Sequence, residues 1–414
     1  MPSASIGPLT SPPNLVRRKG IALCLSGGGY RAALFHLGAL RRLHELQLFP
    51  EIRAISSVSG GSIVAAFLAD RVARSGKSFA EGFSDWQSQV STPFRRLAAR
   101  DIRTWPFFSN LLWNWVWPTP RVRYLQSLYR RLLTRLSLAD LPAQPNFILC
   151  ATDLIFGANW EFSRGRCGSW QAGYVRDAGT WPLARAVAAS SAFPPSFGPL
   201  GLQVPAADWT GGHYQKPGRD QLRRRMALSD GGVYDNMGLE PVWLKYERVL
   251  VSDGGAPFQF SIGDTPWRRL LRYTAVVTYQ TRVLRRRMLF DEWNAHRAEG
   301  CYWTITSGVE PAPASAGEAY LGYSQALASE VLGRVRTDLD SFDPAEMSVL
   351  ENHGYFAAER SLRRHQASLI PADAAPPVSP YPEWEDEAKV RRALRNSGKL
   401  LQAGRLLRGL LQGP

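Results

Sequence analysis

The sequence predicts a three-layer α/β/α fold with a mostly parallel central sheet. Short apolar runs typical of strands alternate along the chain with segments whose apolar residues recur at helical spacing. Such alternation favours parallel strands with helices on both faces of the sheet. Several of the apolar runs end directly in a glycine turn or an acidic residue. Open sheets of this class carry their sites at the carboxyl ends of the strands.

Two strand–turn–helix units follow one another between Ile21 and Asp70. The first strand ends at Ser26, three glycines follow, and leucines at every third residue predict a helix over Arg31–Gln47. The second strand, Arg53–Val58, leads through a serine–glycine–glycine turn into the apolar helix Ser62–Leu68. In a parallel sheet both turns lie at the same carboxyl edge.

Three later apolar runs are predicted to be strands of the same sheet, each with an aspartate at its end. Their residues are Asn146–Leu154 with Asp153, Met226–Ser229 with Asp230, and Arg248–Ser252 with Asp253. Between the strands, we expect a basic amphipathic helix over Arg121–Leu136 and a small-residue helix over Trp181–Ala192.

The 414 residues, 45% of them apolar, are enough for one large core. We expect a flexible leader over 1–20 and a folded domain over 21–360 that includes an aromatic and basic insertion at about 79–140. A proline-rich linker and a basic amphipathic tail then occupy 361–414. Trp105–Trp117 is interpreted as a lid, a membrane patch or core packing, and the tail either lies on anionic lipid or docks on its own domain.

The net charge of +15 favours an anionic partner such as an acidic membrane surface, although it also serves solubility alone. No nucleic-acid-binding motif surrounds the basic residues, so no nucleic-acid partner is expected. No run reaches membrane-spanning length, and the amino terminus has no apolar signal region. We therefore expect a cytoplasmic protein that binds the inner membrane surface peripherally at most.

The cysteines and histidines form no metal-ligand pattern. The four cysteines lie far apart without a CxxC pair, and Cys24 and Cys150 fall within apolar strands, which indicates buried free thiols. No metal and no cofactor are expected.

Ser59 is the first candidate nucleophile. A serine on a tight strand-to-helix turn needs small residues two positions before and after it, because the two backbones crowd there. Ser57 and Gly61 meet this requirement. The same pattern also occurs at a helix amino terminus without catalytic function.

The glycines Gly27, Gly28 and Gly29 are candidates for an oxyanion hole, because bare backbone amides stabilise the negative charge of an acyl-transfer transition state. Arg31 either holds this loop or adds positive potential. The loop also resembles a dinucleotide-binding turn, but that reading requires an acidic residue at the end of the second strand, and none occurs before Asp70. No GK[ST] follows, which excludes a P-loop.

A serine nucleophile needs a base, and none of the six histidines lies at a predicted strand end or beside a glycine turn. An aspartate in a shielded pocket can serve instead, since burial raises its pKa. Asp153, Asp230 and Asp253 are the acids at predicted strand ends, and the last two are each followed by two glycines. Spacing alone does not separate Asp230 from Asp253.

These motifs resemble, in order, those of the bacterial-type patatin-like phospholipases, over residues 21 to about 255. The segments that carry the resemblance are GGGYRA, SVSGG, ATDLIFGANWEFSRG, AVAASSAFPPSF and DGGVYDNMG. The resemblance implies an oxyanion loop of Gly27, Gly28, Gly29 and Arg31, the nucleophile Ser59 and the base Asp230, with Gly61, Gly231 and Gly232 as motif support. Ala32 and Ser57 stand where the family has glycine.

By this resemblance the chain is a lipid acyl hydrolase of the phospholipase A or lysophospholipase type. A Ser59–Asp230 dyad would cleave fatty-acyl esters of phospholipids or other lipids through an acyl-enzyme, without a metal or cofactor. The alternative is a catalytically silent lipid-binding or scaffold protein of the same fold.

Overall fold

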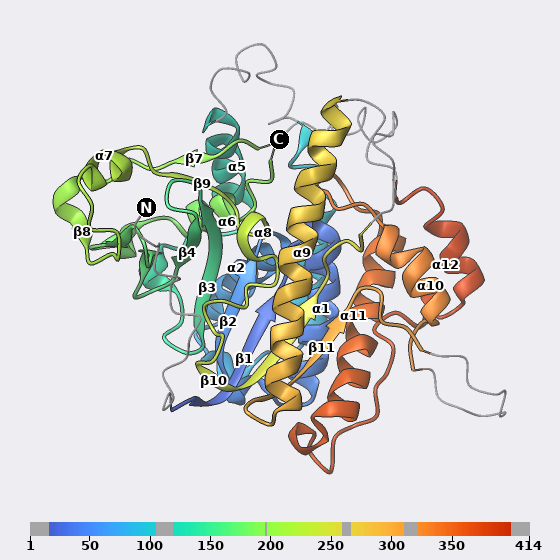
Figure 1. The fold of residues 1–414 in the computed structure, drawn as a ribbon. Helices are drawn as coiled ribbons and strands as arrows, with labels where there is room; N and C mark the ends of the chain where they lie inside the picture. Colours follow the sequence, from blue (N-terminus) through green and yellow to red (C-terminus); the bar gives the residue numbers. More distant parts are fainter. Residues whose placement is uncertain (1–15, 105–118, 195–196, 259–265, 310–320, 399–414) are drawn as a thin grey trace.

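The computed structural model describes residues 16–104, 119–194, 197–258, 266–309 and 321–398. Over these residues the chain forms one central sheet with helices on both of its faces, so the predicted fold class is confirmed (Figure 1). Most of the predicted leader, all of Trp105–Trp117 and the end of the tail lie outside the described residues. None of the described helices is long and apolar enough to cross a bilayer.

The parallel part of the sheet has the strand order β11-β10-β1-β2-β3. Its strands are β1 (Arg18–Leu25), β2 (Ile52–Val58), β3 (Asn146–Asp153), β10 (Tyr246–Asp253) and β11 (Glu299–Thr304). All four neighbouring pairs are parallel. The two turns that follow β1 and β2 therefore lie side by side at the carboxyl edge, as predicted.

Beyond β3 the sheet becomes antiparallel, and the strand that carries Asp230 belongs to this part. β9 (Ala227–Asp230), one of the predicted strands of this mostly parallel sheet, pairs antiparallel with β3, and Asp230 lies opposite Ala151. β4 occupies one side of β3 at these residues, while β2 on the other side has ended at Val58, opposite Cys150. β9 thus fills the place left beyond the end of β2, which brings Asp230 next to the β2–α2 turn.

The remaining elements cover the sheet or extend its antiparallel side. The short strands are β4 (Ala158–Phe162), β5 (Cys167–Ser169), β6 (Gly173–Val175), β7 (Leu200–Gly201) and β8 (Trp209–Thr210). The helices are α1 (Gly29–Glu45), α2 (Gly60–Ser75), α3 (Thr92–Ala98), α5 (Thr119–Leu132), α6 (Leu183–Ser190), α7 (Arg219–Arg224), α8 (Gly232–Asp235), α9 (Pro266–Asn294), α10 (Gln325–Glu330), α11 (Pro344–His365) and α12 (Glu387–Ala393).

α11 packs directly against α1 on one face of the sheet, and two glycines allow the approach. A Cβ at Gly38 would lie 1.9 Å from the Glu351 carbonyl oxygen, and a Cβ at Gly354 would lie 1.8 Å from that of Phe35. Since no side chain fits in either place, the two helix backbones are in contact. The helix that carries the glycine loop is thereby fixed from behind.

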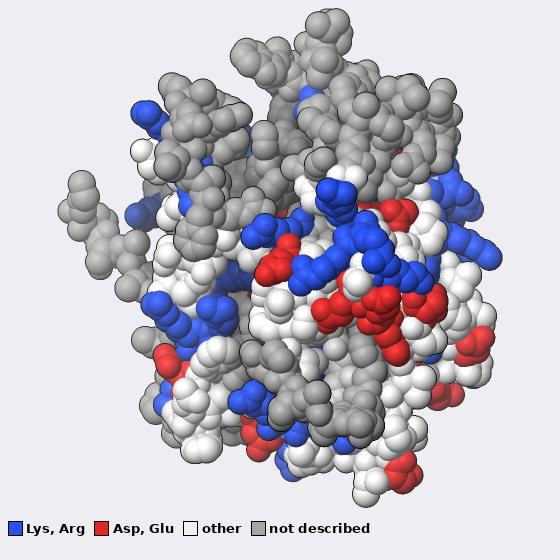
Figure 2. All heavy atoms as spheres, turned by 90° about the vertical axis from the view of Figure 1, so that its right-hand side faces the viewer, with Lys and Arg blue, Asp and Glu red and all other residues white. Residues whose placement is uncertain are grey.

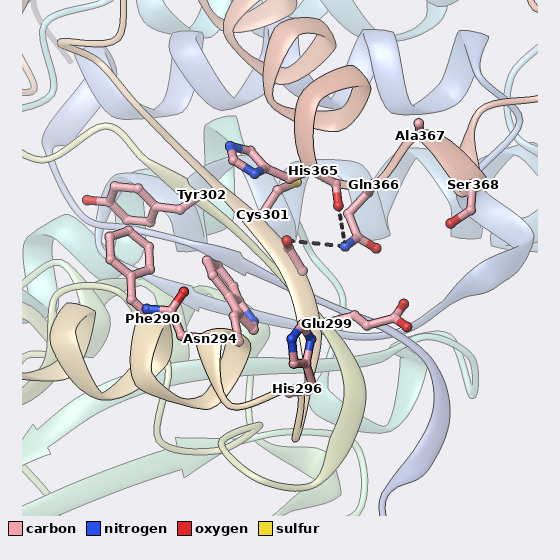
Figure 3. Close-up of a pocket in the computed structure, with 13 residues that line it drawn as sticks. Phe290, Asn294, His296, Glu299, Cys301, Tyr302, His365, Gln366, Ala367 and Ser368 are labelled. Atoms are coloured by element: carbon pink, nitrogen blue, oxygen red, sulfur yellow. Dashed lines mark hydrogen bonds between the residues drawn. The ribbon is translucent and has the colours of Figure 1, made fainter.

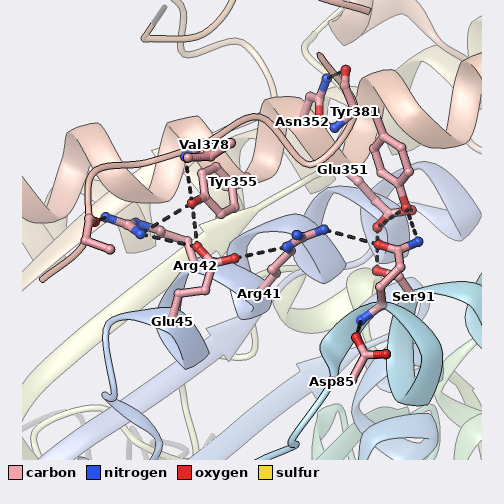
Figure 4. A network of polar contacts seen from close by, with 12 residues as sticks. Arg41, Arg42, Glu45, Asp85, Ser91, Glu351, Asn352, Tyr355, Val378 and Tyr381 are labelled. Atoms are coloured by element: carbon pink, nitrogen blue, oxygen red, sulfur yellow. Dashed lines mark hydrogen bonds and ion pairs between the residues drawn. The ribbon is translucent and has the colours of Figure 1, made fainter. Parts of the chain in front are cut away.

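Buried polar contacts reinforce this contact at the far ends of both helices (Figure 4). Arg42 of α1 donates to Glu359 at 2.7 Å and to the Ala375 carbonyl at 3.0 Å, and both Arg42 and Glu359 are only 1% exposed. Glu351 of α11 accepts from Ser91 at 2.8 Å. These bonds tie the segment after α11 to the domain.

The described part of the tail docks on its own domain. Val390 and Leu394 are buried in the core, and the Ser397 carbonyl accepts from the Arg336 amide at 3.0 Å. Arg391 pairs with Glu330 at 2.8 Å. On the side that carries α10 and α12, basic and acidic side chains lie next to one another (Figure 2). Of the two interpretations of the tail, docking therefore holds as far as residue 398.

All four cysteines are buried and unpaired, as predicted for Cys24 and Cys150. Burial raises the pKa of each thiol, which keeps all four protonated at neutral pH.

We expect Gly38→Ala to destabilise the protein by about 3 kcal/mol, because the new methyl group must separate α1 from α11. Thermal or urea unfolding measures the loss. Gly165→Ala is the matched control, since nothing lies within 4 Å of a Cβ there. Equal stability of the two variants would contradict the close contact.

Candidate active site

Ser59 occupies a strained turn between β2 and α2. Its φ of 51° and ψ of −117° are unfavourable for a residue with a side chain, and such strain is typical of a nucleophile held at the top of a strand. The Ser59 amide donates to the Ser190 hydroxyl at 2.9 Å. Only 9% of the residue is exposed, so the hydroxyl lies in a nearly dry setting.

A chain of three serine hydroxyls supports this turn from below. Ser190 of α6 is 2.9 Å from Ser62, and Ser62 is 3.0 Å from Ser57, which also donates to the Ile148 carbonyl at 3.2 Å. Ser57, where the family has glycine, is therefore accommodated with its hydroxyl bonded. The sequence analysis missed Ser190, because a serine within a small-residue helix carries no signal of its own.

Asp230 lies beside Ser59 at the end of β9. Its Oδ1 accepts from the Gly232 amide at 2.7 Å, and its carboxylate accepts a hydrogen bond from the Ser59 hydroxyl. Burial, which leaves the residue 3% exposed, raises the pKa of Asp230 to about 6, although both hydrogen bonds oppose the rise. The carboxylate is thus ionised at neutral pH and more basic than an exposed aspartate.

The other two candidate acids are engaged elsewhere. Asp253 pairs with Arg282 at 2.6 Å and accepts from the Tyr302 hydroxyl. Burial acts to raise the pKa of Asp253, but the charge and hydrogen bond of Arg282, together with hydrogen bonds from Tyr302 and the Gly255 amide, outweigh burial, and the net shift is downward. Asp153 caps its own turn, accepting from the Ile155 amide at 2.9 Å. The geometry thus separates Asp230 from Asp253, which spacing did not.

The glycine loop touches the serine turn through bare backbone. A Cβ at Gly60 would lie 2.1 Å from the Gly29 carbonyl oxygen, and one at Gly61 would lie 2.2 Å from that of Leu25. Gly28 and Gly29 have positive φ values of 148° and 58°. Within the described residues, no group accepts from the amides of Gly28, Gly29 and Gly60. These three donors remain available to an anion beside Ser59.

The Gly27 amide, by contrast, is already used, because it donates to the Asn236 carbonyl at 3.0 Å. The Asn236 side chain fills a space bounded by three glycines. A Cβ would lie 2.4 Å from its Oδ1 at Gly27, 2.6 Å from its Oδ1 at Gly232, and 2.8 Å from its Nδ2 at Gly255. Asn236 therefore joins the glycine loop to the Asp230 turn. It stands in the DGGVYDNMG segment, where the sequence analysis considered only the aspartate and the glycines.

Arg31 holds the loop and does not face an open site. Its guanidinium is buried and donates to the carbonyls of Val335 at 2.7 Å, Gly254 at 2.9 Å and Gly333 at 3.3 Å. Burial lowers the pKa of Arg31 to about 10, so the group stays charged at neutral pH. Of the two roles expected for Arg31, the geometry favours fixing the loop.

The buried histidines are also structural. His36 bridges Ser252 and the Ser26 carbonyl at 2.7 and 2.9 Å, and burial lowers its pKa to about 4. His353 is bonded to the Ile305 carbonyl at 2.8 Å. Among the described residues, no His, Cys, Asp and Glu side chains are grouped as a metal would require.

A hollow lies at the opposite edge of the sheet from Ser59 (Figure 3). This cavity of about 630 Å³ is lined by the ends of α9 and α11 and by the first residues of β11, including Trp293, Gln366 and Tyr302. Because β11 begins where the parallel strands have their amino ends, this cavity is separate from the Ser59 site.

The family model for patatin-like phospholipases matches residues 23–243, which is more than half of the chain and contains both Ser59 and Asp230. The protein belongs to the patatin-like phospholipase family. Membership supports lipid acyl hydrolysis as the general activity. No curated protein sequence matches the chain.

Similar solved structures include human GIVD cytosolic phospholipase A2 in complex with methyl γ-linolenyl fluorophosphonate, with 13% identity and a TM-score of 0.43 over 85% of this chain and 59% of that one. VipD from Legionella pneumophila has 14% identity and a TM-score of 0.35 over 84% and 67%. The type III effector ExoU has 13% identity and a TM-score of 0.28 over 84% and 53%. In most of these alignments, the chain spans about half to three fifths of the other protein.

Asp230→Asn should make the protein more stable at pH 8. A pKa of about 6 in the folded state against 3.8 when exposed means that ionised Asp230 costs about 3 kcal/mol of folding free energy. The folded wild type holds the extra proton between pH 4 and 6, so its stability falls as the pH rises through this range. Unfolding midpoints should therefore diverge from pH 4 to 6 and stay apart above it. A less stable variant at pH 8 would contradict the assigned burial.

Proposed function

We propose that the protein is a serine lipid acyl hydrolase of the phospholipase A or lysophospholipase type, acting through a Ser59–Asp230 dyad. The observation that carries the proposal is the buried carboxylate of Asp230, hydrogen-bonded to a serine in a strained turn. No histidine is needed, because burial gives the aspartate part of the basicity that a histidine would supply.

In the first step, the Ser59 oxygen attacks the ester carbonyl carbon while Asp230 takes the hydroxyl proton. The Gly232 amide, 2.7 Å from Asp230 Oδ1, keeps the carboxylate oriented during this transfer. Negative charge develops on the carbonyl oxygen as the tetrahedral intermediate forms. Asp230 then passes the proton to the leaving alcohol or lysolipid oxygen, and the fatty acyl group stays on Ser59.

The free amides of Gly28, Gly29 and Gly60 stabilise the developing oxyanion, and the amino termini of α1 and α2 add positive potential. Gly60 supplies the donor that follows a nucleophile in other serine hydrolases. Water, deprotonated by Asp230, subsequently attacks the acyl-enzyme, releases the fatty acid and restores Ser59. Every proton that Asp230 accepts is returned within the cycle.

The two departures from the family motif are compatible with this chemistry. Ser57 is bonded behind the turn, and the methyl group of Ala32 lies where Gly28 and Gly254 leave room for it. Neither residue blocks the serine. The silent lipid-binding alternative therefore has no specific contact in its favour.

Ser59→Ala and Asp230→Asn are each expected to lower the hydrolysis of mixed phospholipid vesicles by at least about a thousandfold, because each removes a group that acts in the transition state. Product analysis by mass spectrometry also identifies the acyl position. A fluorophosphonate probe should label the wild type and leave Ser59→Ala unlabelled.

Ser75→Ala, an exposed position at the far end of α2, controls for the substitution and should retain full activity. Activity that survives Ser59→Ala would overturn the mechanism. A wild type that the probe does not label and that hydrolyses no lipid ester would favour the silent alternative.

The rate of hydrolysis should rise with pH to a plateau, with a midpoint of about 6, because Asp230 must be ionised to accept the proton.

Asn236→Asp should move this midpoint upward. The side-chain oxygens of Asn236 and Asp230 are close together, since a Cβ placed on Gly232 would lie 2.6 Å from the first and 3.0 Å from the second. A second negative charge at position 236 would therefore disfavour the ionisation of Asp230. Stopped assays on a soluble ester between pH 4.5 and 9 measure both profiles. An unchanged midpoint in Asn236→Asp would exclude Asp230 as the titrating base.

A further inference from the structure

The first half of α9 extends beyond the edge of the sheet that carries the dyad. Arg282 pairs with Asp253, the last residue of β10, at 2.6 Å, and Trp293 contacts the start of β11 at Gly300. α9 therefore runs from the carboxyl edge toward the amino edge, and the 16 residues before Arg282 project outward by roughly 24 Å at about 1.5 Å per residue. The projecting end is visible above the strands in Figure 1.

This projecting segment has an unusual surface. All five residues from Tyr273 to Val277 are exposed, and none carries a charge. A helix that packs on one side buries a residue every three or four positions. These five consecutive residues are all exposed, although Phe258 packs on Arg272 and Tyr279, which stand before and after them on the helix. Tyr273 and Val277 are 68% and 63% exposed, which is costly for apolar groups in water.

Three more exposed apolar side chains lie on segments that pair with β9 or follow it. Phe193, 59% exposed, follows Ala192, whose carbonyl accepts from the Asp230 amide at 3.1 Å. Val233, 39% exposed, follows Gly232, which donates to the Asp230 carboxylate. Leu154, 47% exposed, follows the end of β3. Phe193 and Val233 therefore lie on the segments next to Asp230, at the edge of the sheet beyond which α9 projects.

The charge of α9 selects one kind of partner. From Pro266 to Phe290 the helix has no acidic residue, while arginines at 268, 269 and 272 flank the apolar segment. Apolar and aromatic groups beside arginines suit the boundary between the head groups and acyl chains of an anionic bilayer.

We propose that the α9 tip (Tyr273–Val277), together with Leu154, Phe193 and Val233, inserts into the surface of an anionic phospholipid bilayer. The inference rests on the proposed function, because docking there presents acyl esters to Ser59. It does not depend on the Trp105–Trp117 segment or on the end of the tail.

A fluorophore at residue 277 tests the insertion directly. All four native cysteines are buried, so Val277→Cys offers one reactive thiol for an environment-sensitive nitrobenzoxadiazole label. The Ser59→Ala background removes turnover, so that binding is measured alone. Val378→Cys is the matched control: the residue is 70% exposed and lies beside Tyr355, near the far end of α1 (Figure 4).

Vesicles of equal parts phosphatidylcholine and phosphatidylglycerol should shift the emission of the label at 277 to the blue and increase it several-fold, and pure phosphatidylcholine should do so less. The label at 378 should not respond. No response at 277, or an equal response at 378, would overturn the proposal. A shift without vesicles that grows with protein concentration would point to a second copy of the chain and would also overturn it.

Val277→Glu in the same background should weaken vesicle co-sedimentation by at least about tenfold, because a charge replaces a valine that would be buried in the bilayer. Val378→Glu should leave co-sedimentation unchanged. The two hypotheses remain distinguishable. If the wild type hydrolyses no lipid while the label at residue 277 inserts normally, only the proposed activity is rejected. Normal hydrolysis of a soluble ester without insertion would reject only the docking surface.

Discussion

The close approach of two backbones, at Gly29 and Gly60, is the constraint on which the candidate site depends. The glycine loop and the serine turn follow neighbouring parallel strands, and a single methyl group at position 60 would collide with the Gly29 carbonyl at 2.1 Å. Their contact holds together the loop and the turn that carry the amides of Gly28, Gly29 and Gly60, which donate to no group in the part of the chain that the structure describes. α1 cannot retreat to relieve the crowding, because Gly38 and Gly354 hold it equally close to α11.

The same compactness explains how an aspartate can act without a histidine. An exposed carboxylate has a pKa near 3.9 and is a weak base at neutral pH. β9 fills the space beyond the end of β2, which removes Asp230 from water and raises its pKa to about 6. Asp253 is equally buried but faces Arg282 and Tyr302, which together with the Gly255 amide reverse the shift. Burial therefore raises the pKa of Asp230, which faces no cation in the described part of the chain, and fails to raise that of Asp253, which does face one.

The sequence was sufficient to predict the parallel strands, the two turns and the serine, because each depends on local spacing between glycines and apolar residues. It could not supply the antiparallel direction of β9, which is set by where β2 ends relative to β3. Ser190 and Asn236 were missed for the same reason, since each acts by contacting segments distant in the chain. Asp230 and Asp253 have similar neighbours in sequence, and Arg282 and Tyr302, 29 and 49 residues beyond Asp253, distinguish them.

α9 connects the proposed lipid surface to the site by fixed contacts. Arg282 binds Asp253, and three residues further Arg285 donates to the Tyr234 carbonyl at 2.9 Å and pairs with Asp235, within the turn that follows Asp230. Both arginines are largely buried, with side chains 14% and 20% exposed, and they lie on the same continuous helix as residues 273–277. A bilayer that holds residues 273–277 would thereby also fix the orientation of Ser59 and Asp230 toward the lipid, so binding and catalysis share one rigid element.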